Sequence, residues 1–116
     1  MATKKTPKRF STRKTRKHKD SANVQKILYN FINDHYVFNA MMEASIQAIA
    51  KARAKRTIPK YKAIKVISVV VNDARRWYSR HVERLPRLRP EETQAIATRF
   101  YNRYEKDIEK LVKYYQ

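Results

Sequence analysis

The sequence predicts an all-α fold, in which a basic N-terminal arm (residues 1–20) precedes a bundle of three or four helices (residues 21–116). The chain has 116 residues, the length of one domain, and contains neither glycine nor cysteine. The missing glycine removes the preferred residue of tight hairpin turns and excludes Gly-rich phosphate-binding loops. The missing cysteine excludes disulfides and Cys-containing zinc sites. Beyond residue 20, apolar residues recur at spacings of three and four, the period of one helix face.

The first 19 residues are strongly basic and contain no acid. They hold nine of the 28 Lys and Arg residues, and so half of the formal net charge of +18. These nine residues are Lys4, Lys5, Lys8, Arg9, Arg13, Lys14, Arg16, Lys17 and Lys19. A stretch with so little apolar content cannot bury enough surface to fold alone. We interpret it as an arm that binds nucleic-acid phosphates, and a solubilising or import-type tail is the alternative.

A first helical element is expected to begin after an N-cap at Asp20 or Ser21 and to end near Pro59. Its apolar face consists of Val24, Ile27, Leu28, Phe31, Ile32, Phe38, Met41, Met42, Ile46 and Ile49. The segment from Asn33 to Val37 contains poor helix formers, so we expect a kink or a break there.

A second helix is predicted from Lys60 to Leu85. Its apolar positions are Ile64, Ile67, Val71, Ala74, Tyr78, Val82 and Leu85. The run from Val66 to Val71 is β-prone, but its flanks are helical and a lone strand would have no partner, so a helix is expected.

A connector from Leu85 to Pro90 leads to a third helix. Pro90 suits the first helical turn, and Glu91 and Glu92 suit the positive end of the helix dipole. Its apolar face consists of Ala97, Tyr101, Tyr104, Ile108, Leu111 and Tyr115.

Four arginines of the second helix follow one another at spacings of four, four and three, and Arg75 lies beside them. The four are Arg76, Arg80, Arg84 and Arg87. This spacing predicts one arginine stripe on the helix, and Glu83 is the one acid near it. Because guanidinium groups bind phosphate oxygens well, we interpret four of these arginines as DNA-binding residues: Arg75, Arg76, Arg80 and Arg84. A solvated face is the alternative.

Two further groups of cations lie outside that stripe. Around Pro59 are Lys51, Arg53, Lys55, Arg56, Lys60 and Lys62, of which Arg53, Lys55 and Arg56 are taken as DNA-binding residues. The third helix carries Arg99, Arg103, Lys106, Lys110 and Lys113. Because Glu105, Asp107 and Glu109 lie among these, this surface is expected to face solvent or a neighbouring subunit.

The aromatic residues and histidines do not suggest a catalytic site. Trp77, Phe31, Phe38, Phe100 and Tyr104 lie on or beside apolar faces, which predicts packing in the core or between subunits, with base stacking by Trp77 as the alternative. The three histidines form no ligand pattern, and no catalytic residue, metal or cofactor is expected. No apolar stretch follows the basic N-terminus, so we expect the protein to act inside a cell or a particle assembled there.

The first 13 residues read MATKKTPKRFSTR. This stretch resembles the N-terminal arm of major capsid proteins from rod-shaped and filamentous viruses of hyperthermophilic archaea (the rudivirus, lipothrixvirus and tristromavirus group). The shared pattern is a Met-Ala start, Thr-Pro, a basic residue, Phe-Ser and Arg. The rest of the chain matches in architecture alone. The charged C-terminus, without a Gly-rich apolar half, favours the two-protein lipothrixvirus or tristromavirus type.

The resemblance implies a structural role without sequence reading. In that family a basic helical arm wraps double-stranded DNA in the A-form, and a helical bundle forms the outer shell. Many copies, often as dimers of one or two related proteins, build a helical tube, and some members add a lipid envelope. The implied place is the nucleocapsid of a virion assembled in the host cytoplasm. The alternatives are a cellular chromatin or nucleoid protein, a ribosomal or other RNA-binding protein and, least favoured, an enzyme acting on nucleic acid.

Overall fold

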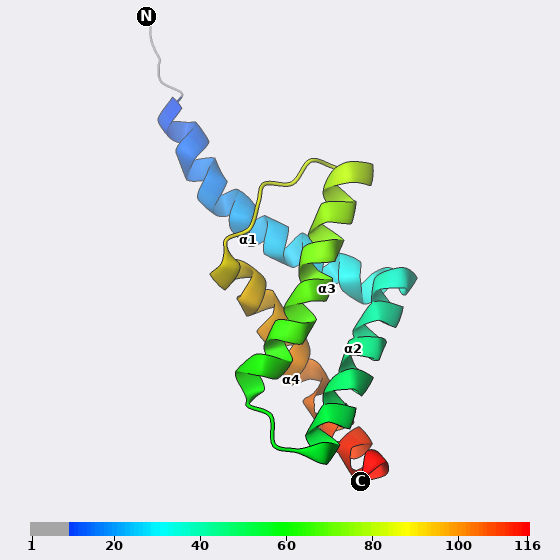
Figure 1. Ribbon diagram of the computed structural model, residues 1–116. Coiled ribbons are helices and arrows are strands. Elements are labelled where there is room, and N and C mark those ends of the chain that lie inside the picture. Colours follow the sequence, from blue (N-terminus) through cyan, green and yellow to red (C-terminus); the bar gives the residue numbers. More distant parts are fainter. Residues whose placement is uncertain (1–9) are drawn as a thin grey trace, which may run out of the picture.

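The computed structural model describes the backbone of residues 10–116 and the side chains of residues 22–116. Four helices follow one another, α1 (Phe10–Asp34), α2 (Tyr36–Lys55), α3 (Lys60–His81) and α4 (Pro90–Tyr115), and the described part holds no strand (Figure 1). The predicted all-α class is therefore confirmed. The β-prone run from Val66 to Val71 lies inside α3, so the helix expected there is confirmed as well.

Helix α1 begins earlier than the sequence predicted. We expected an N-cap at Asp20 or Ser21, but α1 starts at Phe10 and passes through both residues without interruption. The physical reason is that no proline or glycine stands between Phe10 and Asp34, and Lys and Arg are good helix formers. Half of the basic N-terminal stretch is thus part of a helix that continues into the bundle.

The break between α1 and α2 lies at His35, inside the segment that predicted it. His35 has extended backbone angles, φ −87° and ψ 117°. The hydrogen bonds on either side persist, because the His35 N–H donates to the Phe31 carbonyl (2.8 Å) and the Asn39 N–H donates to the His35 carbonyl (2.8 Å). The Asn39 side-chain amide also donates to the Asn33 carbonyl (2.6 Å). One residue therefore turns the chain sharply while the backbone stays bonded (Figure 1).

Helix α3 ends at His81, four residues before the predicted end at Leu85. Pro86 disfavours helical geometry at Leu85, and Leu85 instead reaches the core from the connection between α3 and α4, where it is 8% exposed. Its N–H donates a hydrogen bond to Ser79 Oγ (3.2 Å), which ties the connection to α3. Val82, predicted as a core position, is 58% exposed.

Helix α4 begins at Pro90 as predicted, with Glu91 and Glu92 in its first turn. Glu92 Oε1 accepts a hydrogen bond from the Arg89 N–H (2.8 Å), which satisfies one backbone donor ahead of the helix. The buried face of α4 is wider than the predicted one, because Thr93, Ile96 and Phe100 are also buried.

One hydrophobic core joins all four helices. Most positions of the predicted apolar faces lie in it or pack against it. Several large side chains in this core are almost completely buried, each less than 2% exposed. They are Phe100, Leu28, Ile32, Met42, Ile67, Ile96, Ile108 and Val71.

Helices α1 and α4 pack with their chains running in the same direction. The ring of Tyr29 stacks on the ring of Phe100, with 4.3 Å between centroids. One turn further along both helices, Arg103 donates a hydrogen bond to Asn33 Oδ1. This register sets Lys19 level with Pro90, the first residue of α4. Residues 10–19 of α1 therefore project past the start of α4 by about 15 Å, in the direction that Figure 1 shows.

Candidate nucleic-acid interface

The charges of the chain are segregated among its elements. Helix α4 carries five cations and five acids and is neutral. Residues 51–65, around the corner between α2 and α3, carry seven cations and no acid. Residues 75–89, which span the end of α3 and the connection to α4, carry six arginines and the single acid Glu83. With the basic N-terminal stretch, three separate segments thus hold the excess positive charge.

The predicted arm residues fall into two groups. Lys4, Lys5, Lys8 and Arg9 lie outside the described residues. The other five lie on the part of α1 that projects past the start of α4, and they are Arg13, Lys14, Arg16, Lys17 and Lys19. The backbone that carries these five is helical.

The corner between α2 and α3 presents its predicted cations unequally. Lys55 and Arg56 are exposed. Arg53 is half-buried and donates a hydrogen bond from Nη1 to Tyr101 Oη of α4 (3.2 Å). Lys60 Nζ lies 5.3 Å from the centre of the same Tyr101 ring, at cation–π range. Arg53 and Lys60 therefore bind this corner to α4, while Lys55 and Arg56 face solvent.

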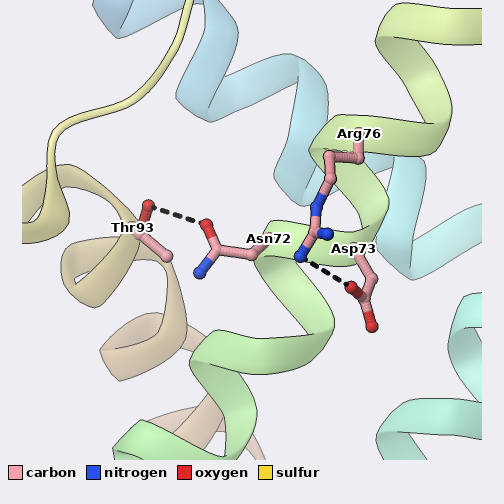
Figure 2. Close-up of polar contacts among 4 residues, drawn as sticks. All are labelled: Asn72, Asp73, Arg76 and Thr93. Carbon is pink, nitrogen blue, oxygen red and sulfur yellow. Dashed lines mark hydrogen bonds and ion pairs between the residues drawn. The ribbon is translucent and has the colours of Figure 1, made fainter.

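The predicted single arginine stripe does not form. Arg76 and Arg80 lie on α3, but Arg84 and Arg87 lie beyond its end, in the connection, because the helix stops at His81. Arg76 also forms an ion pair with an acid of the same helix, since its Nη2 lies 3.3 Å from Asp73 Oδ1 (Figure 2). The spacing of three residues from Asp73 to Arg76 was the signal in the sequence for this pair. Arg80 and Arg84 are exposed.

Three arginines instead meet around a hollow of about 330 Å³ between α3 and the connection. The hollow is lined by Asn72, Arg75, Arg76, Arg87 and Leu88. Thr93 Oγ1 of α4 donates a hydrogen bond to Asn72 Oδ1 (3.5 Å), so one lining residue of the hollow is tied to the first turn of α4 (Figure 2).

Arg75 is the least exposed of the three arginines. Burial lowers its pKa, and the neighbouring charges of Arg87 and Arg76 lower the pKa further. The hollow thus gathers positive charge without a matching number of acids.

The aromatic residues near the arginines pack inward. Trp77 stacks on Phe31, with 5.6 Å between ring centroids, and Tyr78 meets Phe31 edge-on at 5.1 Å. Trp77 also lies against Phe38 and under the ring of His81. The predicted packing role of Trp77 is therefore confirmed, and these contacts hold the junction of α1 and α2 against α3.

No hydrogen bond joins the Asp34 carboxylate to the His35 ring among the described residues. Asp34 Oδ1 accepts a hydrogen bond from Asn33 Nδ2 (3.4 Å). His35 Nδ1 is buried and has no hydrogen-bond partner among the described residues. The His35 ring lies among the rings of Phe31, Phe38 and Trp77, which gives it a packing role.

None of the helices between residues 10 and 116 is long and apolar enough to cross a membrane. Over the described residues, no group of three or more His, Asp or Glu side chains is placed to hold a metal ion. In comparisons with known proteins, the chain has no significant match to a protein-family model, to a curated protein or to a solved structure.

Proposed function

We propose that the protein is a structural nucleoprotein that coats double-stranded DNA through its phosphate backbone, without reading the sequence. The observation that carries the proposal is the segregation of charge. Helix α4 is neutral, whereas the N-terminal stretch, residues 51–65 and residues 75–89 carry the excess of Lys and Arg. Carboxylates held against phosphates are repelled, so the part of α4 that carries Glu105, Asp107 and Glu109 forms the surface away from the DNA.

The amount of charge suits a coat protein. Duplex DNA carries one charge per roughly 1.7 Å, so a net charge of +18 matches about 30 Å of duplex. Sequence-independent binding needs many phosphate contacts and no base-reading motif. The corner between α2 and α3 and the connection between α3 and α4 lie at opposite ends of the bundle (Figure 1), and together with the projecting part of α1 they supply such contacts.

The narrower proposal is a major capsid protein of a filamentous or rod-shaped archaeal virus. The resemblance of residues 1–13 supports it, as does an all-helical, basic chain in which a basic segment precedes a bundle. In this proposal, copies of the chain, or the chain and a related second subunit, dimerise and polymerise on A-form DNA into a helical filament. The site of action is then the nucleocapsid of the virion, with or without a lipid envelope around the filament.

The test combines a titration with electron microscopy. Two unrelated duplexes of equal length are titrated with the protein at several salt concentrations, and mixtures are imaged with longer duplex DNA. We expect equal affinities for the two sequences, a steep fall of affinity with salt and uniform rigid filaments. A strong preference for one sequence, or an affinity independent of salt, contradicts the coating role. Compact irregular complexes favour a chromatin protein, and tight binding to structured RNA without assembly on DNA favours an RNA-binding protein.

A further inference from the structure

The hollow between α3 and the connection is built from two separate segments of the chain. Arg75 and Arg76 come from successive positions of α3, and Arg87 comes from the connection. The connection is fixed by the hydrogen bond from the Leu85 N–H to Ser79 Oγ (3.2 Å) and by the burial of Leu85. The fold therefore brings the backbone of α3 and of the connection together, and side chains of three arginines line the space between them.

The charges around this space are not balanced by the protein. Asp73 contacts only Arg76, and both of these side chains are substantially exposed, so their pairing in water is weak. Neither Arg75 nor Arg87 forms an ion pair with any described residue. Burial first, and then the neighbouring charges of Arg87 and Arg76, lower the pKa of Arg75, so its charged form is disfavoured where it lies. A bound anion offsets this penalty.

The chemistry of the lining favours a phosphate group among anions. Guanidinium groups bind phosphate oxygens in a two-pronged geometry. Asn72 Oδ1 accepts a hydrogen bond from Thr93, and the Asn72 amide nitrogen has no hydrogen-bond partner among the described residues. The lining thus offers N–H donors from four side chains, with Leu88 as its one apolar member. The volume of about 330 Å³ is roughly ten times the ~30 Å³ share of one water molecule, so it admits a tetrahedral oxyanion with its hydration.

We infer that this hollow is a discrete phosphate-binding site and that its occupant is a phosphodiester of the nucleic-acid backbone. The second half of this inference rests on the proposed function. Its support is position, because Asn72 is tied to Thr93 in the first turn of α4, and the basic part of α1 projects past that same end of α4. In this inference, a nucleic-acid strand that follows the projecting part of α1 also reaches the hollow.

The first experiment uses inorganic phosphate as the probe and the full chain as the protein. The side-chain N–H signals of Asn72 and Arg75 are followed by NMR while phosphate replaces chloride at constant ionic strength. The test variant is Arg75→Gln with Arg87→Gln, and the matched control is Lys106→Gln with Lys110→Gln, which removes the same charge from exposed positions of α4. We expect saturable shifts of both signals in the unmodified protein and the control. In the test variant, which has no Arg75, we expect the Asn72 signal no longer to shift. Shifts that do not saturate, or that survive in the test variant, overturn the site. Circular dichroism confirms that each variant is folded.

The second experiment identifies the occupant by titrating duplex DNA with the same variants. We expect the test variant to bind about tenfold more weakly and its log–log salt slope to fall by about one, since one phosphate contact is lost. The control is expected to keep the slope. If the unmodified protein binds DNA and the test variant keeps its affinity and slope, the occupant is not a backbone phosphate. If the unmodified protein binds no DNA while inorganic phosphate still saturates the hollow, the proposed function fails, the phosphate site stands and the occupant is a phosphate from another source, such as a phosphorylated protein.

Discussion

The ring of Tyr29 in α1 lies flat on the ring of Phe100 in α4, with 4.3 Å between centroids and 21° between planes. The guanidinium of Arg99 lies 4.1 Å from the centre of the Tyr29 ring, so Tyr29 is held by two residues of α4. Phe100 is 1% exposed and is among the largest fully buried side chains. This contact fixes the height at which α1 packs on α4, and hence how far the basic part of α1 projects.

Replacing Tyr29 by alanine is expected to lower the free energy of unfolding by about 2 kcal/mol, because the stacked ring and its cation–π contact are both lost. Tyr29→Phe keeps the ring and is the control, with an expected loss of less than about 0.5 kcal/mol. Urea denaturation followed by circular dichroism measures both. Equal losses in the two variants contradict a role for the stacked ring.

Ser79→Ala is expected to destabilise the protein by about 1 kcal/mol, because the buried Leu85 N–H loses its partner Ser79 Oγ. Hydrogen exchange at the Leu85 amide should become faster, since the connection is released from α3. Ser68→Ala is the matched control in the same helix. Ser68 Oγ bonds only to the Ile64 carbonyl within α3, and alanine has the higher helix propensity, so the control is expected to be neutral or stabilising. Unchanged exchange at Leu85 in Ser79→Ala is the contrary result.

Removing residues 1–19 is expected to leave a folded helical bundle that binds DNA much more weakly. The truncation removes half of the net charge but stops level with the first residue of α4, so the buried positions from Val24 onward keep their contacts. Circular dichroism, thermal unfolding and the DNA titration measure the two effects. A large loss of cooperativity in unfolding shows that the removed stretch has a structural role, and an unchanged affinity shows that the bundle alone binds DNA.

Arg80→Ala with Arg84→Ala is expected to weaken DNA binding about tenfold or more and to lower the salt slope by about two. Both arginines are exposed and belong to the acid-poor segment of residues 75–89. Lys106→Ala with Lys110→Ala removes the same charge from the neutral helix α4 and is expected to leave the slope unchanged, although it can perturb assembly. If the α4 pair has the larger effect on the slope, the assignment of the two surfaces is reversed.

The sequence predicted the class and most of the core because apolar periodicity and proline are local signals. Pro90 placed the start of α4, and the poor helix formers near His35 placed the break. The sequence does not reveal the start of α1, because dense charge without apolar residues is typical of unfolded segments, although Lys and Arg favour helix. The end of α3 was missed because Val82 and Leu85 keep the helical spacing after the helix has stopped, and only Pro86 marked the change.

The candidate site was less predictable than the fold. Arg84 and Arg87 also keep the helical spacing, so the sequence placed them on a stripe that the connection removes. The hollow depends on Arg87 and Leu88 coming back against Asn72 and Arg75, and that arrangement is tertiary. The Asp73–Arg76 pair is local, and its spacing of three was present in the sequence.

Because α1 is continuous from Phe10 to Asp34, the positions of its basic residues around the helix axis are fixed relative to the bundle. Each residue of an α-helix adds about 100° of rotation and about 1.5 Å of rise. One residue inserted between Lys19 and Val24 turns the entire preceding stretch by about 100° around the helix axis, whereas seven residues restore its direction to within about 20° and move it outward by about 10 Å. A basic tail on a flexible linker is insensitive to such insertions. In this protein, the number of residues between Lys19 and Val24 sets the direction in which the basic stretch of α1 faces relative to the bundle.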